Sequence, residues 1–226
     1  MRGWGNPPPL SFLWGYIGGT MEIEVTGVLL AGGKSRRMGE DKRHLRVGEQ
    51  TLLERGLAVL RSTFQDVLVV IAQDSPPLDV EAQVVRDLVP DCGSLGGLYT
   101  GLMQAATPYI FVVACDMPFL DPAVLAQFTS RRANADIVMA KLASRIHPMH
   151  ALYSKRCLPL VERMIQARQL KIQEMVADRS LHVRYVTEDD LRIIDPSGRS
   201  FQNVNTPADL ELARALLAQL PPAKPL

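Results

Sequence analysis

The sequence predicts an α/β protein, a three-layer α/β/α sandwich built on a mostly parallel sheet. Two observations predict this class. Short apolar runs rich in β-branched residues alternate with helical segments along the chain, which is typical of strands that lie between helices. Hydrophobic residues make up 47% of the 226 residues, enough to fill a sizeable core. Residues 21–220 contain no internal repeat or linker, so one domain is expected.

The first half of this domain is expected to contain three strands and a helix. Val25 to Ala31 is an apolar run followed by glycines and predicts a buried strand. A helix is expected over about residues 52–61. The next strand should span residues 66–72, because the turn sequence that begins at Asp74 would end it. Val84-Val85 indicates a further short strand.

The middle of the chain continues the alternation. Residues 93–106 are interpreted as a glycine loop that leads into a helix, and residues 109–115 as another buried strand. Asp121 followed by Pro122 predicts a helix start, because aspartate is a favoured N-cap and proline suits the first helical position. Residues 135–140 and 149–153 are expected to be strands.

The last third contains the clearest helix start in the chain. Thr206-Pro-Ala-Asp209 has the spacing of a capping box, and apolar residues then recur at helical intervals. Before it, residues 155–177 are expected to be helical in two pieces, and residues 182–187 to form a late strand.

The two ends of the chain differ from the domain. Residues 1–20 contain an early arginine, three prolines and a short apolar stretch that Ser11 and Gly15 interrupt, which does not favour a signal peptide. We expect an extension outside the fold, with Met21 as the functional start. Residues 221–226 are proline-rich, and we expect a frayed tail.

The composition excludes several classes of protein. The net charge is +1, which gives no support to a non-specific nucleic-acid binder. The three cysteines form no CxxC pair, so we expect neither a disulfide scaffold nor a zinc ribbon, and a reducing, cytoplasmic location. The longest apolar run in the domain, residues 109–115, is far shorter than the ~20 residues of a membrane span, so no membrane association is expected.

A basic, glycine-rich loop follows the first strand. Residues 34–46 contain six of the 25 Lys and Arg residues against two acidic residues. Glycines 32, 33 and 39 allow backbone amides to approach an anion without a Cβ in the way. A solvated basic turn would not explain adjacent glycines directly after a buried strand. The loop therefore indicates a polyphosphate site.

Two well-known phosphate loops do not fit this segment. Gly33-Lys34-Ser35 matches the end of a Walker A motif, but the glycine required at position 28 is a valine that belongs to the strand. The dinucleotide pattern GxGxxG is also absent. A P-loop NTPase and a dinucleotide-dependent dehydrogenase are both disfavoured.

Asp116 is the candidate metal ligand. It follows a run of seven apolar or aromatic residues. This places it at the carboxyl end of a predicted parallel strand, where α/β sheets bind their ligands. Capping the next helix is the alternative role, but Asp121 already supplies that cap. Mg²⁺ in nucleotide sites is commonly held by one or two carboxylates together with phosphates and water. We expect this carboxylate to be an unpaired, partly buried anion.

Six ordered motifs resemble those of the molybdenum cofactor guanylyltransferases, and the resemblance spans residues 25–219. They are Leu30-Ala-Gly-Gly-Lys-Ser-Arg-Arg-Met-Gly-x-Asp-Lys42, Asp87, Gly93-Ser-Leu-Gly-Gly97, Cys115-Asp-Met-Pro118, His147-Pro-x-x-Ala-Leu152 and Asn203-Val-Asn-Thr-Pro207. The resemblance implies a Rossmann-like fold of the nucleotide-diphospho-sugar transferase type. It also implies an enzyme that joins GMP from GTP to the terminal phosphate of molybdopterin and releases pyrophosphate.

The resemblance also implies roles for individual residues, which form three groups. The nucleotide-binding group would be Leu30, Ala31, Gly32, Gly33, Lys42, Asp87 and Asp116. Arg37 and Lys42 would hold phosphates, and Asp116 would bind Mg²⁺, so that these three form the catalytic set. His147, Pro148, Asn203 and Asn205 would face the pterin. Proteins that make or receive the molybdenum cofactor would be its protein partners.

This assignment agrees with the chemistry read from the residues. The nucleophile is a phosphate oxygen already present on the substrate, so no Ser-His or Cys-His pair is required. The obstacle is repulsion between two polyanions, which cations and positioning overcome.

Two departures from the family pattern bear on specificity. The family often has an asparagine beside the base after the second strand, where this chain has Ile71-Ala72-Gln73, so the choice of guanine stays open. Ser94 stands where proline is common. The alternatives are therefore a cytidylyltransferase acting on the same cofactor, a sugar-phosphate nucleotidyltransferase, and a non-catalytic nucleotide or cofactor carrier.

Spacing gives expectations for the histidine and asparagine motifs. His147 and His150 lie three apart on a predicted strand and should point to opposite faces, which disfavours a shared metal site. For His150 we expect a packing histidine with its hydrogen bonds satisfied. Asn203 and Asn205 should share a face at strand spacing.

Overall fold

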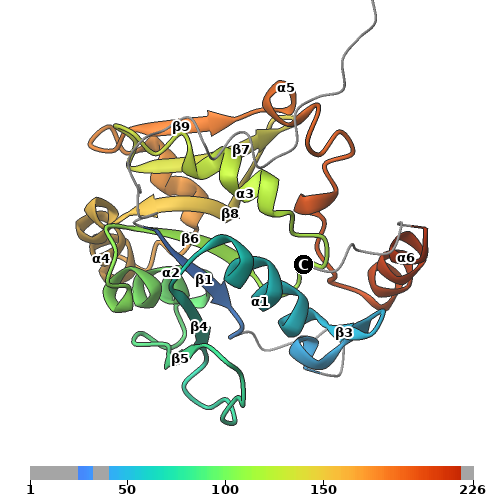
Figure 1. The fold of residues 1–226 in the computed structure, drawn as a ribbon. Coiled ribbons are helices and arrows are strands. Elements are labelled where there is room, and N and C mark those ends of the chain that lie inside the picture. Colours follow the sequence, from blue (N-terminus) through green and yellow to red (C-terminus); the bar gives the residue numbers. More distant parts are fainter. Residues whose placement is uncertain (1–24, 33–40, 220–226) are drawn as a thin grey trace, which may run out of the picture.

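The computed structural model describes residues 25–32 and 41–219, which form a seven-stranded sheet with helices on both sides (Figure 1). The strands are β1 Val25–Leu30, β2 Arg46–Val47, β3 Gln50–Thr51, β4 Val67–Ile71, β5 Gln83–Arg86, β6 Tyr109–Ala114, β7 Ile137–Leu142, β8 Arg145–Ser154 and β9 Val183–Val186. The α-helices are α1 Leu52–Thr63, α2 Gly93–Gln104, α3 Pro122–Thr129, α4 Leu158–Gln166, α5 Glu188–Leu191 and α6 Pro207–Ala218. Short 3-10 helices are η2 Lys42–His44, η3 Lys155–Cys157, η4 Ile172–Ala177 and η5 Arg199–Phe201.

The sheet has the strand order β5-β4-β1-β6-β8-β7-β9. β1 pairs in parallel with β4 and with β6, so it lies near the centre of the sheet. Within the described sheet, β8 alone runs antiparallel to its neighbours, β6 and β7. The prediction of a mostly parallel sheet is confirmed.

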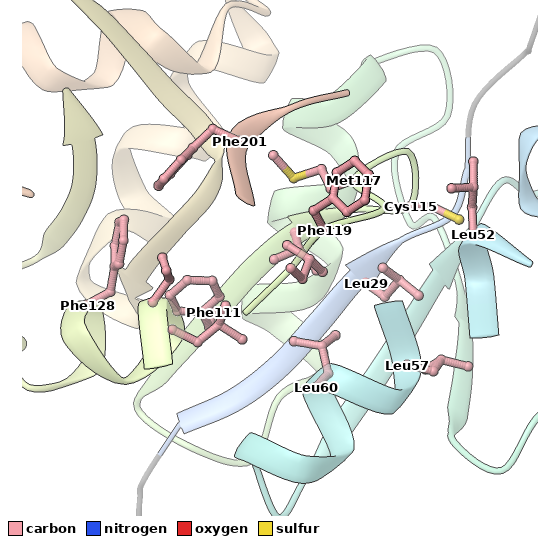
Figure 2. Close-up of a cluster of buried hydrophobic side chains, with 14 of the residues drawn as sticks. Leu29, Leu52, Leu57, Leu60, Phe111, Cys115, Met117, Phe119, Phe128 and Phe201 are labelled. Carbon is pink, nitrogen blue, oxygen red and sulfur yellow. The ribbon is translucent and has the colours of Figure 1, made fainter. Parts of the chain in front are cut away.

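Two apolar cores lie on the two faces of the sheet and give the three layers. The first core contains side chains of α1, α3 and α6, and the second contains side chains of α2 and α4. Figure 2 shows part of the first core, where Leu29 of β1, Leu60 of α1 and Phe111 of β6 are buried together. Because parallel strands are covered on both faces, they are largely apolar on both faces, as β1 and β6 are.

The helix starts follow local chemistry. Asp121 caps α3 by accepting a hydrogen bond from the Ala123 main chain at 2.7 Å, and Pro122 is its first residue. Thr206 caps α6 in a reciprocal capping box with Asp209. Both helix starts agree with the sequence.

Three features differ from the predictions. Helix α2 begins at Gly93 itself, so the expected glycine loop is the first turn of the helix. A β2–β3 hairpin was not predicted, because strands of two residues carry no readable periodicity. Residues 202–205, to which strand spacing was applied for Asn203 and Asn205, form no strand.

Glycine allows α2 to pack closely against β1. A Cβ at Gly97 would lie 2.9 Å from Leu30 Cδ1, closer than a side-chain carbon can approach. At the end of β1, a Cβ on Gly32 would lie 2.8 Å from the main-chain nitrogen of Ala72. These contacts bring the start of α2 and the ends of β1 and β4 together at one edge of the sheet.

The expected N-terminal extension and C-terminal tail lie outside the described residues, and the division of the chain into these parts stays a prediction. Among the helices of the described segments, none is both long and apolar enough to cross a membrane. Cys92, Cys115 and Cys157 are all buried and form no disulfide with one another.

Candidate functional site

A cavity of about 510 Å³ lies at the carboxyl ends of β1, β4 and β6. This is the edge at which open parallel sheets bind their ligands, and the volume is in the range of small-molecule sites. The lining comprises Leu30, Ala31, Gly32, Asp41, Lys42, Arg43, Val70, Ile71, Ala72, Asp87, Asp91, Gly93, Ser94, Gly97, Ala114, Cys115, Asp116 and Met149. The cavity therefore contains six of the residues that the sequence assigned to the nucleotide.

The end of β1 is fixed from both sides at this cavity. The main-chain N–H of Ala31 donates to the Val70 carbonyl at 2.8 Å, and that of Cys115 donates to the Leu30 carbonyl at 3.0 Å. Gly32 then abuts the backbone of Ala72. Leu30, Ala31 and Gly32 thus form one rigid wall. Gly33 and Arg37 lie outside the described residues, so their expected roles stay predictions.

Lys42 and Asp116 form an ion pair at the cavity. Lys42 Nζ donates to Asp116 Oδ2 at 3.1 Å and to Asn205 Oδ1 at 2.9 Å. Asn203 Nδ2 donates to the other carboxylate oxygen, Oδ1 of Asp116, at 2.7 Å. Four residues from three distant segments of the chain therefore meet at one point. We call these four residues the Lys42–Asp116 cluster.

Local structure positions each member of this cluster. Asp116 lies two residues after the end of β6, and its carbonyl accepts a hydrogen bond from the main-chain N–H of Val204 at 2.8 Å. That contact holds the extended segment before α6 against the end of β6. The side chains of Asn203 and Asn205, two residues apart, point to the same side, as their spacing predicts.

The expectation that Asp116 is an unpaired anion is wrong. Both of its carboxylate oxygens accept hydrogen bonds, and its side chain is 19% exposed. The pairing escaped sequence reasoning because Lys42 and Asn203 lie 74 and 87 residues away in the chain.

Asp87 lies on the opposite wall, just after β5. Its Oδ1 accepts hydrogen bonds from the Val89 main chain at 3.1 Å and from the Thr100 hydroxyl at 3.0 Å. Gly96 lies so close that a Cβ there would be 3.0 Å from Asp87 Oδ2. The carboxylate is therefore held rigidly beside the first turns of α2. It is in place to contact a ligand group in the cavity.

His147 and Pro148 lie apart from this cavity, whose described lining includes neither. The His147 ring contacts the ring of Phe201, with centroids 5.1 Å apart, and Phe201 precedes Asn203 by two residues. Burial lowers the pKa of His147, and the nearby Arg145 charge acts in the same direction. The lowered pKa favours the neutral ring of His147 at pH 7, and its partner Phe201 lies two residues before Asn203 of the cluster in the chain.

A bulge in β8 overturns one prediction. Ala140 of β7 pairs with His147, whereas the preceding Met139 pairs with Ala151, so residues 148–150 have no opposite partners in β7. Because the alternation of faces fails across a bulge, the rings of His147 and His150 both contact Phe201. Within residues 25–32 and 41–219, no three His, Cys, Asp or Glu residues are grouped so that they could hold a metal.

His150 is buried inside a cage of phenylalanine rings. Its ring centroid lies 5.5 Å from that of Phe111, 5.4 Å from that of Phe128 and 4.5 Å from that of Phe201. The expected packing role is confirmed, but in the described structure neither ring nitrogen has a hydrogen-bond partner, so the expected satisfaction is wrong. Burial lowers the pKa of His150 from 6.5 to about 3.

We expect His150 to make the protein acid-sensitive. The folded state keeps the ring neutral down to about pH 3, whereas the unfolded chain takes up a proton below about pH 6.5. Stability should therefore be lost as the pH falls through this window, by up to about 1.4 kcal/mol per pH unit. His150→Phe should have a shallower acid dependence of the unfolding free energy, measured by urea denaturation between pH 7 and 4.

The exposed His44 provides the control for this measurement, because its side chain is 65% exposed and folding removes little of it from water. His44→Gln should keep the slope of the parent protein. Identical slopes for His150→Phe and the parent would contradict the assignment.

Sequence reasoning missed one feature beside the cluster, the pair formed by Asp41 and Arg43. Arg43 Nε donates to both carboxylate oxygens of Asp41, at 2.9 and 2.8 Å, and Nη2 also donates to Oδ2. The Arg43 guanidinium holds the pKa of Asp41 below its usual range. The sequence shows only two opposite charges around Lys42, because burial cannot be read from it.

The chain is similar to known proteins over most of its length. Residues 27–183 match the family model described as a MobA-like NTP transferase domain. A probable molybdenum cofactor guanylyltransferase from Pelotomaculum thermopropionicum is 34% identical over 86% of this chain and 94% of its own length. Another, from Chloroflexus aggregans, is 37% identical over 87% of this chain and 97% of its length.

A solved structure agrees with these sequence matches. Molybdopterin-guanine dinucleotide biosynthesis protein A from Archaeoglobus fulgidus superposes with a TM-score of 0.74 and 28% identity. The match covers 86% of this chain and all of that chain.

Proposed function

Because the chain belongs to the MobA-like NTP transferase family, we propose that it transfers GMP from GTP to the terminal phosphate of molybdopterin and releases pyrophosphate. One structural observation supports this proposal above the others. Lys42 reaches from the start of the domain to Asp116 and Asn205, and this cluster lies at the cavity edge where a parallel sheet binds ligands.

The proposed reaction is a substitution at the α-phosphorus of GTP. A terminal phosphate oxygen of molybdopterin forms a bond to that phosphorus. The bond from the α-phosphorus to the oxygen bridging to the β-phosphate breaks, and pyrophosphate leaves with the electron pair. The attacking oxygen is already anionic, so the protein supplies positioning and positive charge.

The nucleotide is assigned to the cavity between β1 and α2. The rigid Leu30–Gly32 wall would present backbone groups to it, and Asp87 would contact its nucleoside part. Lys42 would hold the phosphates, together with Arg37. The charge-assisted contacts of a lysine are well suited to this role, since ammonium groups donate strongly to phosphate oxygens.

A Mg²⁺ ion fits the donor set at Asp116. Each carboxylate oxygen accepts one hydrogen bond and has a further lone pair, and the side chain lines the cavity. One carboxylate is enough when substrate phosphates and water complete the coordination. When bound, the ion would neutralise charge that develops on the transferred phosphoryl group.

The acceptor is assigned to the side of the cluster away from the nucleotide cavity. Asn203 and Asn205 would offer amide groups there, and His147 contacts Phe201, which precedes Asn203 by two residues. Amide and neutral imidazole groups can donate to a pterin and its phosphate without adding a negative charge.

The proposal is tested by measuring pyrophosphate release with matched substrates. GTP, CTP and ATP are each supplied with molybdopterin or with glucose 1-phosphate as the acceptor, with Mg²⁺ or with EDTA. We expect release with GTP, molybdopterin and Mg²⁺ together, its loss in EDTA, and its return when Mg²⁺ is restored.

The other outcomes identify the alternatives. A preference for CTP would make the protein a cytidylyltransferase, and release with glucose 1-phosphate would make it a sugar-phosphate enzyme. Nucleotide binding without pyrophosphate release under any condition would make it a carrier.

A further inference from the structure

Lys42 lies in the chain between Asp41 and Arg43, which are hydrogen-bonded to each other. Asp41 accepts hydrogen bonds from Arg43 through its main-chain N–H, at 3.0 Å, and through the guanidinium. Asp41 is thereby also the N-cap of η2, the short helix that begins at Lys42. The backbone on both sides of Lys42 is therefore fixed by one three-residue link, here called the Asp41–Arg43 clamp.

The clamp buries a charged side chain whose hydrogen bonds are incompletely satisfied, which lowers the stability of the fold. Arg43 is only 6% exposed, and its Nη1 has no hydrogen-bond partner in the described structure. Burying a guanidinium with an unsatisfied donor costs free energy, and apolar residues of similar volume often stabilise such positions better. Stability alone therefore does not explain an arginine at this place.

The clamp lies at the cavity, beside the lysine whose ammonium must be placed accurately. Asp41, Lys42 and Arg43 all line the cavity, and the Lys42 ammonium must reach two acceptors that lie 74 and 163 residues away in the chain. The Lys42 side chain has four rotatable carbon bonds and can take many rotamers. A fixed backbone reduces the entropy lost in holding its ammonium in one place.

We propose that Asp41 and Arg43 are positioning residues that hold Lys42 against Asp116 and Asn205. The expected effect on GMP transfer rests on the proposed function. The expected effect on the position of the Lys42 ammonium does not. Arg43 acts through Lys42 and need not touch substrate. The clamp keeps the ammonium in the geometry that the transferred phosphates require.

Arg43→Met tests the clamp, because methionine keeps much of the side-chain length and removes the charge and the donors. We expect kcat/KM for GTP to fall roughly tenfold or more, since small misplacements of catalytic groups have effects of this size. The double variant Asp41→Asn/Arg43→Met should lose no more than Arg43→Met alone, because the two residues act as one unit. It also avoids leaving Asp41 without its partner if Arg43→Met is unstable.

Arg131→Met is the matched control. Arg131 and Asp190 form a comparable, partly buried ion pair at 2.7 Å, and neither residue lines the cavity. Its loss should lower the melting temperature and leave kcat/KM per folded molecule unchanged.

A second readout needs no substrate. The folded proteins are treated briefly with acetic anhydride, and acetylation of Lys42 is measured by mass spectrometry relative to Lys171, whose side chain is 73% exposed. In the parent protein Lys42 is 20% exposed and hydrogen-bonded, so it should react slowly. Arg43→Met should raise its relative rate about threefold or more, and Arg131→Met should not.

The two readouts separate the inference from the proposed function. If the parent protein fails to transfer GMP but Lys42 becomes more reactive in Arg43→Met, the proposed function fails and the clamp stands. If Lys42 keeps its reactivity in Arg43→Met, or if only the melting temperature changes, Arg43 is a structural residue and the inference is overturned.

Discussion

Asp116→Asn is expected to lower turnover by about a hundredfold or more, the scale for loss of one electrostatic stabiliser in an active site. The substitution keeps the shape of the side chain and removes its charge. Asp116 is the carboxylate that the Lys42 ammonium and the Asn203 amide hold at the cavity edge. A neutral amide would bind Mg²⁺ weakly and would no longer pair with Lys42.

The effect on folding should be small. The Lys42–Asp116 pair is about one-fifth exposed, and Lys42 keeps Asn205 as an acceptor in the variant, so we expect a loss of about 1 kcal/mol, the upper end for ion pairs with solvent access. Stability should therefore fall slightly, whereas the rate falls by orders of magnitude. A structural aspartate would give the opposite result, a lower melting temperature with a normal rate per folded molecule.

Asp121→Asn is the control for this variant. Asp121 lies five residues further along the same segment and caps α3, outside the cavity lining. Asparagine is an equally good N-cap, so neither rate nor stability should change appreciably. Near-normal turnover in Asp116→Asn would remove Asp116 from the catalytic set.

Lys42→Ala is expected to give the second large effect. Loss of charge-assisted contacts to phosphate costs on the order of 1.5–3 kcal/mol, which corresponds to roughly a 10- to 150-fold fall in kcat/KM for GTP. Arg37→Ala should have an effect of the same order. Because Lys42 also pairs with Asp116, the double variant Asp116→Asn/Lys42→Ala should be less impaired than the sum of its parts predicts.

Lys171→Ala is the control for Lys42→Ala. Lys171 is largely exposed, 4.0 Å from Glu174, and is not part of the cavity lining, so its loss should leave kcat/KM unchanged. Parental activity in the double variant Arg37→Ala/Lys42→Ala would exclude the basic loop as the nucleotide site.

Much of the fold could be predicted because its determinants are local. The apolar runs of β1 and β6 mark buried parallel strands by themselves. The starts of α3 and α6 depend on caps within four residues of sequence, at Asp121 and Thr206. The position of Asp116 followed for the same reason, since it ends one of these runs.

The arrangement of the site could not be predicted, because it depends on distant pairings. Lys42 and Asn205 meet although 163 residues separate them, and nothing local in either segment indicates the other. The bulge in β8 changes which faces His147 and His150 occupy, and spacing along an assumed regular strand gave the wrong answer. Arg43 looks like any surface arginine in the sequence, because its burial follows from the packing around it.

The most direct test of the account is mass-spectrometric detection of the pterin product. The protein is incubated with GTP, Mg²⁺ and molybdopterin, with Asp116→Asn treated in parallel. The account predicts that the parent protein converts molybdopterin to a product heavier by one guanylyl group (GMP less one water), with one pyrophosphate released per product, and that Asp116→Asn forms almost none. Release of GMP without a pterin dinucleotide, or equal product from both proteins, would contradict it.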